Sequence, residues 1–153
     1  MNPLFSPIKL KGLTLPNRIV VPPMDQYSAD KGRPVQWHAM HYGTLAVSGA
    51  GLLIVEATAV EAPGRISPQD LGLWNEEQEA AHKAMLDSIR SYSSTPIGIQ
   101  LGHVDLGAAG DAEIAGFSLH IDGIGGRFHL FGDGIGKHTA VSGKGDTGGQ
   151  HQK

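Results

Sequence analysis

The chain has 153 residues, the size of a single domain, with a formal net charge of -3 and a sequence pI of about 6.2. This weakly acidic balance argues against the dense Lys/Arg patch that nucleic acids and anionic membranes select, so neither is expected as a partner. The absence of cysteine excludes disulfides, thiolate nucleophiles and cysteine-based zinc sites.

The first residues, MNPLFSPIKLKG, lack a basic start followed by an apolar h-region. No later segment approaches the roughly 18 uncharged apolar residues of a membrane span. We therefore expect a soluble, cytoplasmic protein that does not cross a membrane.

Residues 4–15 predict a short hairpin with its turn at Gly12. The apolar run Ile19–Val21 predicts a strand that ends at Pro22, because proline cannot donate a hydrogen bond to a sheet ladder. After a polar loop, apolar residues predict a helix over about residues 35–47.

The run AGLLIVEATAV, residues 50–60, predicts a strand buried on both faces, as in a parallel sheet. Asn75 is predicted to cap a second helix, with Gln78 as its capping-box partner. This helix should end before residues 93–96, and the run Ile97–Leu101 predicts the next strand. The order βαβαβ predicts an α/β fold with a parallel sheet and right-handed crossovers.

The sequence pattern changes beyond residue 103, since 13 of the 22 glycines lie in the last 50 residues. Phe117–Ile121 and Arg127–Phe131 are short apolar pieces that could pair as a hairpin. The final stretch SGKGDTGGQHQK, residues 142–153, is expected to be disordered, because it has no apolar side chains to bury.

Residues 132–138, GDGIGKH, superficially resemble a phosphate-binding loop. The match fails at Phe131, where a glycine is needed, and at His138, where serine or threonine is needed. We therefore interpret the segment as glycine-rich low complexity. A small phosphate-binding module that uses this segment is kept as a weaker alternative to the two main functional hypotheses given below.

His38 and His41 stand at i and i+3 on the first predicted helix, a spacing that can share a metal ion. No acidic residue stands between them as a general base, and no third ligand is indicated. We expect packing and capping roles for these histidines and assign no metal.

Ligands of parallel α/β sheets bind at the carboxyl ends of the strands. The predicted strands offer these residues there: Pro23, Met24, Asp25, Tyr27, Glu56, Ala57, Thr58, Gln100 and His103. We interpret the set as a ligand site. For Thr58 or Gln100 taken singly, the alternative is that the side chain only satisfies local backbone groups.

Four segments carry a family resemblance: LFSPIKLKGLTLPNRIVVPPM, HYGTLAVSGAGLLIVEATAVEAPGRIS, DLGLWNEEQ and IGIQLGH. In order and spacing they resemble the N-terminal part of the Old Yellow Enzyme family, the FMN-dependent ene-reductases and NAD(P)H:flavin oxidoreductases, over residues 3–103. The bacterial subgroup that includes xenobiotic reductases is resembled most. The resemblance implies a (β/α)₈ barrel with FMN at its C-terminal face, reduced by NAD(P)H and passing hydride to an activated alkene.

The resemblance also implies roles for single residues. The backbone at Pro23 and Met24 would lie against the flavin, Ala57 would approach the carbonyl edge of the ring, and Gln100 would hydrogen-bond its pyrimidine end. Tyr27 would face the substrate.

The chain departs from the family at Asp25, where this subgroup commonly has cysteine. A carboxylate there would repel the anionic reduced flavin, which should lower the reduction potential of the flavin or raise the pKa of Asp25. The segment Asp70–Trp74 is expected to fold over the same rim or to lock the following helix, with a packing role for Trp74.

A second departure follows residue 103, where the family continues with an Ala-Gly-Arg type loop and this chain reads Val104-Asp-Leu-Gly. A barrel of this type needs eight βα units and typically ~250 residues, and the pattern supports about the first three units. We therefore expect an incomplete TIM barrel over residues 1–103 and a glycine-rich, irregular, non-family tail over 104–153. The family's paired substrate-binding residues, flavin-contacting arginine and phosphate-binding loops would be missing. A frameshifted or truncated gene product is the favoured explanation, with divergence and an error in the source DNA as alternatives.

Two main functional hypotheses follow. The first is an FMN-dependent NAD(P)H oxidoreductase of the ene-reductase type, represented by its N-terminal portion. The alternative is an inactive fragment that is degraded, aggregates or self-associates through its open sheet edges.

Overall fold

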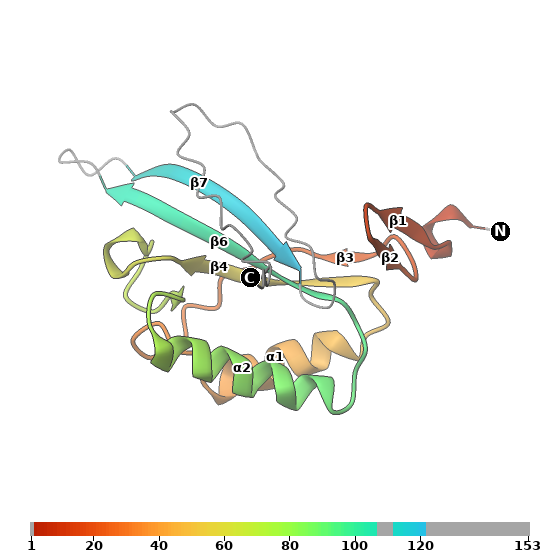
Figure 1. The fold of residues 1–153 in the computed structure, drawn as a ribbon, viewed down its shortest axis with the longest axis horizontal. Helices are drawn as coiled ribbons and strands as arrows, with labels where there is room; N and C mark the ends of the chain where they lie inside the picture. The colour runs from red at the N-terminus through yellow and green to blue at the C-terminus, as the bar shows by residue number, and fades with distance from the viewer. Residues whose placement is uncertain (1, 107–111, 122–153) are drawn as a thin grey trace, which may run out of the picture.

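The computed structural model describes residues 2–106 and 112–121, with side chains described up to Val104. The chain contains both helices and strands, which Figure 1 shows in order of colour along the sequence. In chain order they are the short 3₁₀ turn η1 (Pro3–Phe5), β1 (Ile8–Leu10), β2 (Leu13–Leu15), β3 (Val20–Val21), α1 (Gln36–Ala46), β4 (Leu52–Ala59), η2 (Ala62–Gly64), β5 (Leu71–Gly72), α2 (Glu76–Arg90), β6 (Ile97–Leu106) and β7 (Ala112–Ile121).

The main sheet has the strand order β3-β4-β6-β7, and the short strand β5 also pairs with β4. The pairs β3–β4, β4–β5 and β4–β6 are parallel, whereas β6–β7 is antiparallel. The path β3-α1-β4-α2-β6 is the βαβαβ order that the sequence predicted. The predicted α/β class with a parallel sheet is therefore confirmed.

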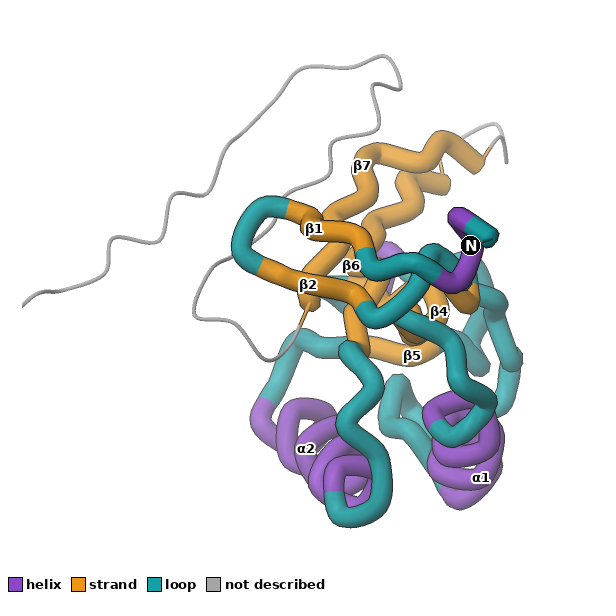
Figure 2. The backbone as a smooth tube through the Cα atoms, turned by 90° about the vertical axis from the view of Figure 1, so that its right-hand side faces the viewer, coloured by secondary structure: helices purple, strands orange, loops and turns teal. Residues whose placement is uncertain are grey.

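Both helices cover the same face of this sheet, as Figures 1 and 2 show. The core between helices and strands is apolar and nearly closed to water. It is built from Ala29, Tyr42, Ala46, Leu53, Val55, Leu71, Met85, Ile89 and Ile97. We call the opposite side of the sheet the inward face, because in a closed (β/α)₈ barrel the helices form the outer ring.

The hairpin β1–β2 packs at the amino ends of the strands. Leu13 and Leu15 form a second, smaller apolar cluster with Leu52, and half-buried Ile54 packs against it. Leu52 and Ile54 alternate with the helix-facing Leu53, so this cluster covers the inward face of β4 at its amino end. In Figure 1 the hairpin lies at the right, while the arrowheads of β4 and β6 point to the left. The carboxyl ends of the strands are therefore at the end away from the hairpin.

Helix α1 confirms the predicted helix at residues 35–47 to within a residue at each end. At its start, the backbone N–H of Val35 donates to Nδ1 of His38 at 3.0 Å. After its end, Gly49 takes a left-handed φ of 88°, which glycine adopts without a steric penalty. The capping role expected for His38 is therefore confirmed.

Helix α2 begins after Asn75, whose Oδ1 accepts a hydrogen bond from the backbone N–H of Gln78 at 3.1 Å. The reciprocal bond of a capping box was predicted to run from Gln78 to Asn75, and this detail was wrong. Oε1 of Gln78 instead accepts from the backbone N–H of Trp74 at 2.9 Å, and Nε2 donates to the carbonyl of Lys31 at 3.0 Å. Gln78 thus joins the start of α2 to the loop that follows β3.

Strand β6 extends five residues beyond the predicted end, and β7 pairs with it. Phe117–Ile121 is extended, as its pattern predicted, but its partner is β6 rather than residues 127–131. An entirely irregular tail was therefore not the right expectation for residues 112–121. Residues 127–131, 132–138 and 142–153, for which the sequence also gave expectations, lie outside the described residues.

Candidate functional site

A β-bulge shapes the carboxyl half of β4. Val55 pairs with Ile99 and Ala57 pairs with Gln100, so Glu56 is one extra residue on the β4 side of the ladder. A bulge of this kind reverses the alternation of side chains beyond it. Because Ile97 and Ile99 pack toward the helices, Gln100 faces inward, and its register partner Ala57 lies on the inward face with it.

Along β6, and at its register positions on β4, the residues that flank Gln100 on the inward face have little or no side chain. Gly98 and Gly102 flank it along β6, and Ala57 and Ala59 alternate along β4 beside them. The surface beside the amide of Gln100 on β4 and β6 is therefore low in side-chain bulk, as the close approach of a flat group requires.

The loop after β3 carries the remaining predicted site residues. Pro23 and Asp25 are partly buried, whereas Met24 and Tyr27 are 46% and 56% exposed. Tyr27 has a left-handed φ of 48°, an uncommon conformation for a tyrosine, and its backbone N–H donates to Oδ1 of Asp25 at 3.1 Å. The loop thus presents the ring of Tyr27 to solvent while the carboxylate of Asp25 turns back into the protein.

Asp25 is in an environment that disfavours its charge. Burial raises the pKa of Asp25 from 3.8 to about 6; the hydrogen bond from Tyr27 opposes this effect, and the nearby carboxyl groups of Asp70 and Glu56 add to it. Its Oδ2 atom is buried and accepts no hydrogen bond among the described residues. The raised pKa agrees with one of the two consequences expected of a carboxylate at this position, although here it arises from the protein alone.

The fully buried carboxyl group of Glu56 lies beneath the bulge, between two side chains of α1. The hydroxyl of Tyr42 donates to its Oε2 at 2.6 Å, and Nε2 of His38 is 3.4 Å from its Oε1. The same Tyr42 hydroxyl accepts the backbone N–H of Glu56 at 3.0 Å. Burial, together with the negative charge of Glu56, raises the pKa of Tyr42 and keeps the phenol protonated.

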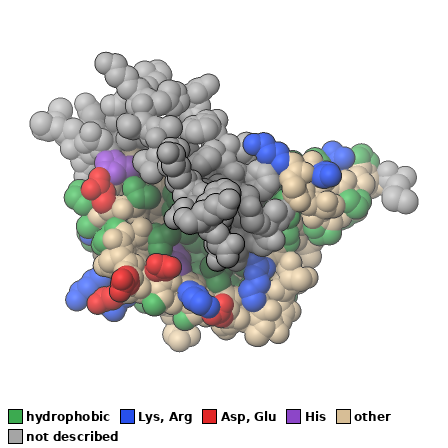
Figure 3. Space-filling model, viewed as in Figure 1, with side chains coloured by type: hydrophobic (Ala, Val, Ile, Leu, Met, Phe, Trp, Pro, Cys, Tyr) green, Lys and Arg blue, Asp and Glu red, His purple; other side chains and the backbone are tan. Residues whose placement is uncertain are grey.

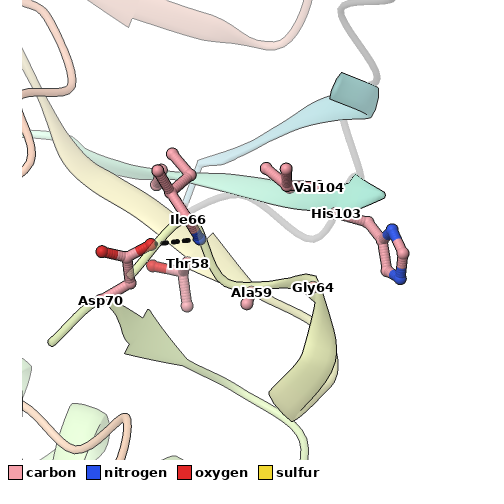
Figure 4. Close-up of a pocket in the computed structure, with 9 residues that line it drawn as sticks. Thr58, Ala59, Gly64, Ile66, Asp70, His103 and Val104 are labelled. Atoms are coloured by element: carbon pink, nitrogen blue, oxygen red, sulfur yellow. Dashed lines mark hydrogen bonds between the residues drawn. The ribbon is translucent and has the colours of Figure 1, made fainter. Parts of the chain in front are cut away.

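A second buried carboxyl group, Asp70, organises the loop before β5. It accepts hydrogen bonds from the backbone N–H groups of Ile66 and Ser67 at 2.6 and 2.9 Å, and from the Ser67 hydroxyl at 2.6 Å. Figure 4 shows Asp70 beside Thr58, at a small pocket lined also by Gly64 and Val104. This loop therefore forms one wall of the carboxyl end of β4.

Thr58 and His103 have local partners at this end of the sheet. The Thr58 hydroxyl donates to the carbonyl of Glu56 at 3.0 Å, which is the local backbone role that the sequence left open for it. His103 pairs with Glu61 through Nε2 at 2.5 Å, and Figure 4 shows its ring at the outer side of the pocket. Neither side chain extends the inward surface around Gln100.

Trp74 has the packing role that was expected. A Cβ atom on Gly72 would lie only 1.9 Å from its ring, and one on Gly32 only 2.7 Å, so both glycines are needed for this contact. The guanidinium of Arg65 lies 5.3 Å from the ring centroid, within cation–π range. The ring joins the loops after β3 and β4 at the start of α2.

The described side chains on the face seen in Figure 3 have mixed charge rather than a patch of one sign. In Figure 3, acidic and basic side chains alternate over the helical layer. Within residues 2–104 no group of three or more His, Asp or Glu side chains is arranged to hold a metal ion. In the same part of the chain, neither helix has the length and apolarity that a bilayer crossing requires.

Tyr42 and His38 are polar residues of this region that the sequence did not place at the carboxyl ends of the strands, whereas Asp70 belongs to the segment that was expected at this rim. A single signal pointed to Tyr42 and His38. Glu56 interrupts an apolar run that should be buried on both faces, and a buried carboxylate requires partners. The sequence could not tell which helix would supply those partners.

Comparisons with known proteins agree with this architecture. Residues 3–116 match the model of the NADH:flavin oxidoreductase / NADH oxidase family. The NADPH dehydrogenase of Geobacillus sp. (strain WCH70) is 45% identical over 113 residues, which cover 72% of this chain and 33% of that protein. The NADPH dehydrogenase of Listeria welshimeri is 47% identical over 116 residues, covering 74% and 34%.

Among solved structures, the Old Yellow Enzyme homologue from Zymomonas mobilis superposes with a TM-score of 0.59 and 30% identity. The match covers 65% of this chain and 28% of that one. The chain thus corresponds to part of a TIM barrel and spans about a third of the length of the curated relatives that it matches. Because the family model matches well over half of the residues, the chain belongs to the NADH:flavin oxidoreductase / NADH oxidase family.

Proposed function

We propose that this chain is the flavin-ring-binding part of an FMN-dependent NAD(P)H oxidoreductase of the ene-reductase type. The observation that carries the proposal is the register of β4 and β6, which sets Gln100 beside Ala57 with Ala59, Gly98 and Gly102 around them on these two strands. Family membership supports it, since the curated relatives are NADPH dehydrogenases. When bound, FMN supplies the ability to accept hydride from NAD(P)H and to donate it to an activated alkene.

The described residues fit the ring portion of FMN. Gly98 and Gly102 add no side chain to the inward face of β6, and the amide of Gln100 can both donate and accept a hydrogen bond. The buried Oδ2 of Asp25 is an acceptor near the carboxyl ends of the strands that lacks a donor among the described residues. The fit concerns the ring, since the resemblance assigns the phosphate-binding loops to the part of the family that this chain does not match.

In this proposal, the backbone at Pro23 and Met24 contacts the ring, Ala57 lies at its carbonyl edge and Gln100 binds its pyrimidine end. The left-handed backbone at Tyr27 holds the exposed phenol away from the sheet, where it would face the substrate. The carboxyl of Asp25, whose pKa is already raised to about 6, tunes the redox potential. We further propose a cytoplasmic location and a small-molecule substrate.

Titration of the 153-residue chain with FMN, followed by flavin fluorescence and absorbance, tests the proposal. Gln100→Ala should weaken FMN binding about tenfold, the loss expected for one good hydrogen bond. The matched control is Gln36→Ala, which removes an exposed amide at the start of α1 and should leave binding unchanged. Absence of FMN binding, or equal weakening in both variants, would count against the proposal.

The role proposed for Asp25 has its own measurement. The bound flavin should have a more negative reduction potential in the original chain than in Asp25→Cys, because a carboxylate disfavours the anionic reduced ring. The potentials are measured by equilibration with a reference dye. Equal potentials would contradict the tuning role.

A second candidate function is that of a non-catalytic chain that associates with another copy or with another protein. The observation that favours it is the outer edge of β3, which pairs with no strand among the described residues and carries Val20 at 43% exposure. Val20→Lys should then convert an associated species to a monomer in light scattering. A monomeric original chain would exclude self-association through this edge.

A further inference from the structure

The bulge at Glu56 requires a hydrogen-bond acceptor that the sheet does not provide. The extra residue of a bulge is left out of the ladder, so its backbone N–H needs another partner. Here the partner comes from α1, because Oη of Tyr42 accepts that N–H at 3.0 Å. Tyr42 also donates its proton to Oε2 of the same residue at 2.6 Å. One buried phenol therefore binds both the backbone and the side chain of Glu56.

His38 completes the surroundings of the carboxyl group. Its Nδ1 accepts the N–H of Val35 at 3.0 Å, so the proton of the neutral ring is on Nε2. Nε2 points to Oε1 of Glu56 at 3.4 Å, a contact too long for a good hydrogen bond, and neither atom has another partner among the described residues. Tyr42 is thus the main support of the bulge, and His38 contributes a weaker one.

The bulge decides which residue of β4 reaches the inward face. In a regular ladder, Glu56 would pair with Gln100 and place a carboxylate on the inward face. With the bulge, Glu56 turns to the helices and Ala57 takes the place beside Gln100. A small neutral residue replaces a charged one at the position closest to Gln100.

We propose that Tyr42 is a positioning residue, which holds Glu56 in the bulge and thereby sets Ala57 beside Gln100 on the ligand face. Tyr42 acts through β4 and lies in the layer between helix and sheet, on the opposite side from the ligand face. The part of the proposal that concerns flavin rests on the proposed function, whereas the part that concerns the bulge does not.

The first test uses the flavin-free chain and NMR hydrogen exchange. Tyr42→Phe should accelerate exchange of the Glu56 amide by about tenfold or more, as expected when a buried N–H loses its acceptor. The amides of β4 residues 53–55 should be unchanged. Tyr92→Phe removes the hydroxyl of an exposed tyrosine outside the network and serves as the matched control. Unchanged exchange at Glu56, or equal acceleration along all of β4, would overturn the proposal.

The second test measures FMN affinity and the absorbance spectrum of the bound flavin. Tyr42→Phe should weaken binding about tenfold, because a smaller fraction of the chain has Ala57 in place. Deletion of Glu56 in the Tyr42→Phe chain removes the residue that needs the hydrogen bonds of Tyr42 and leaves Ala57 opposite Gln100. This deletion should therefore restore the FMN affinity and the flavin spectrum of the original chain.

This double variant also decides the case in which Tyr42→Phe alone does not fold: recovery supports the positioning role, and no recovery overturns it. If the original chain does not bind FMN at all, the proposed function fails. The amide exchange of Glu56 then still decides the proposal for the bulge.

Discussion

The two ends of the parallel strands differ in what they bury. At the amino end, Leu52 and Ile54 pack on the hairpin residues Leu13 and Leu15 with no buried charge among them. At the carboxyl end, the buried residues of the same strand and its neighbours include Glu56 and Asp70, with Asp25 partly buried beside them. Apolar packing stabilises one end, and a set of costly buried polar groups shapes the other. The costly buried polar groups are therefore concentrated at the end of the sheet where the ligand site is proposed, and the amino end is stabilised by apolar packing.

The largest expected effect comes from the apolar core that joins the strands to the helices. Leu53 is fully buried between β4 and the helices, so Leu53→Ala should lower the free energy of unfolding by about 2–5 kcal/mol through lost burial and the cavity that remains. Urea unfolding measures this change. A loss below 1 kcal/mol would show that the strands are not stabilised mainly by this core.

Asp70→Ala tests whether a buried carboxyl group at the other end also stabilises the fold. It leaves the N–H groups of Ile66 and Ser67 without their acceptor and should cost about 1–3 kcal/mol of unfolding free energy. Asp70→Asn keeps one oxygen acceptor and should cost less. Equal losses in both variants would mean that the negative charge, rather than the hydrogen bonds, is what this loop requires.

Asp25 should destabilise the chain at neutral pH. Its pKa in the folded state, about 6, is above the ordinary value of 3.8, so the folded state binds the proton more tightly. The contribution of this group to stability is full below pH 4 and is lost as the pH rises through 6. The difference in unfolding free energy between the original chain and Asp25→Asn should therefore change by about 1–2 kcal/mol between pH 4 and pH 7, a range reduced for the partial exposure of the group. A pH-independent difference would contradict this prediction.

The smallest effect on the free energy of unfolding is expected for a solvent-exposed ion pair. Lys83 and Asp87 form an ion pair one turn apart on α2, and both side chains are well exposed. Lys83→Ala should change the unfolding free energy by less than about 0.5 kcal/mol. A loss comparable to that of Asp70→Ala would remove the contrast between solvent-exposed and buried polar groups.

The sequence predicted the order of strands and helices because the apolar runs and the Asn75 cap are local signals. It also placed Ala57 and Gln100 at carboxyl ends of neighbouring strands. The family resemblance implied that both contact the flavin, but the residue pattern did not show that they face the same side, because this depends on one extra residue in β4. A shift of one residue in register leaves the composition of an apolar run unchanged, so periodicity could not reveal it.

The sequence pattern also did not predict the antiparallel pairing of β7 with β6. Its residues have a strand-like pattern, but the choice between β6 and residues 127–131 as partner depends on contacts distant along the chain. The left-handed backbone at Tyr27 was missed for a different reason. Tyrosine rarely adopts this conformation, and the position lacks the glycine or asparagine that would predict it.

The hydroxyl of Tyr42 has a consequence for how this strand tolerates mutation. The Tyr42 hydroxyl oxygen on α1 accepts the backbone N–H of Glu56, which has no acceptor in the sheet ladder. The residues at positions 42 of α1 and 56 of β4 therefore depend on each other. Loss of the phenol should be tolerated best together with loss of residue 56, because the chain then has no extra residue in β4 whose N–H needs an acceptor. A side chain of the helix therefore determines which residues of the covered strand face the sheet's inward side.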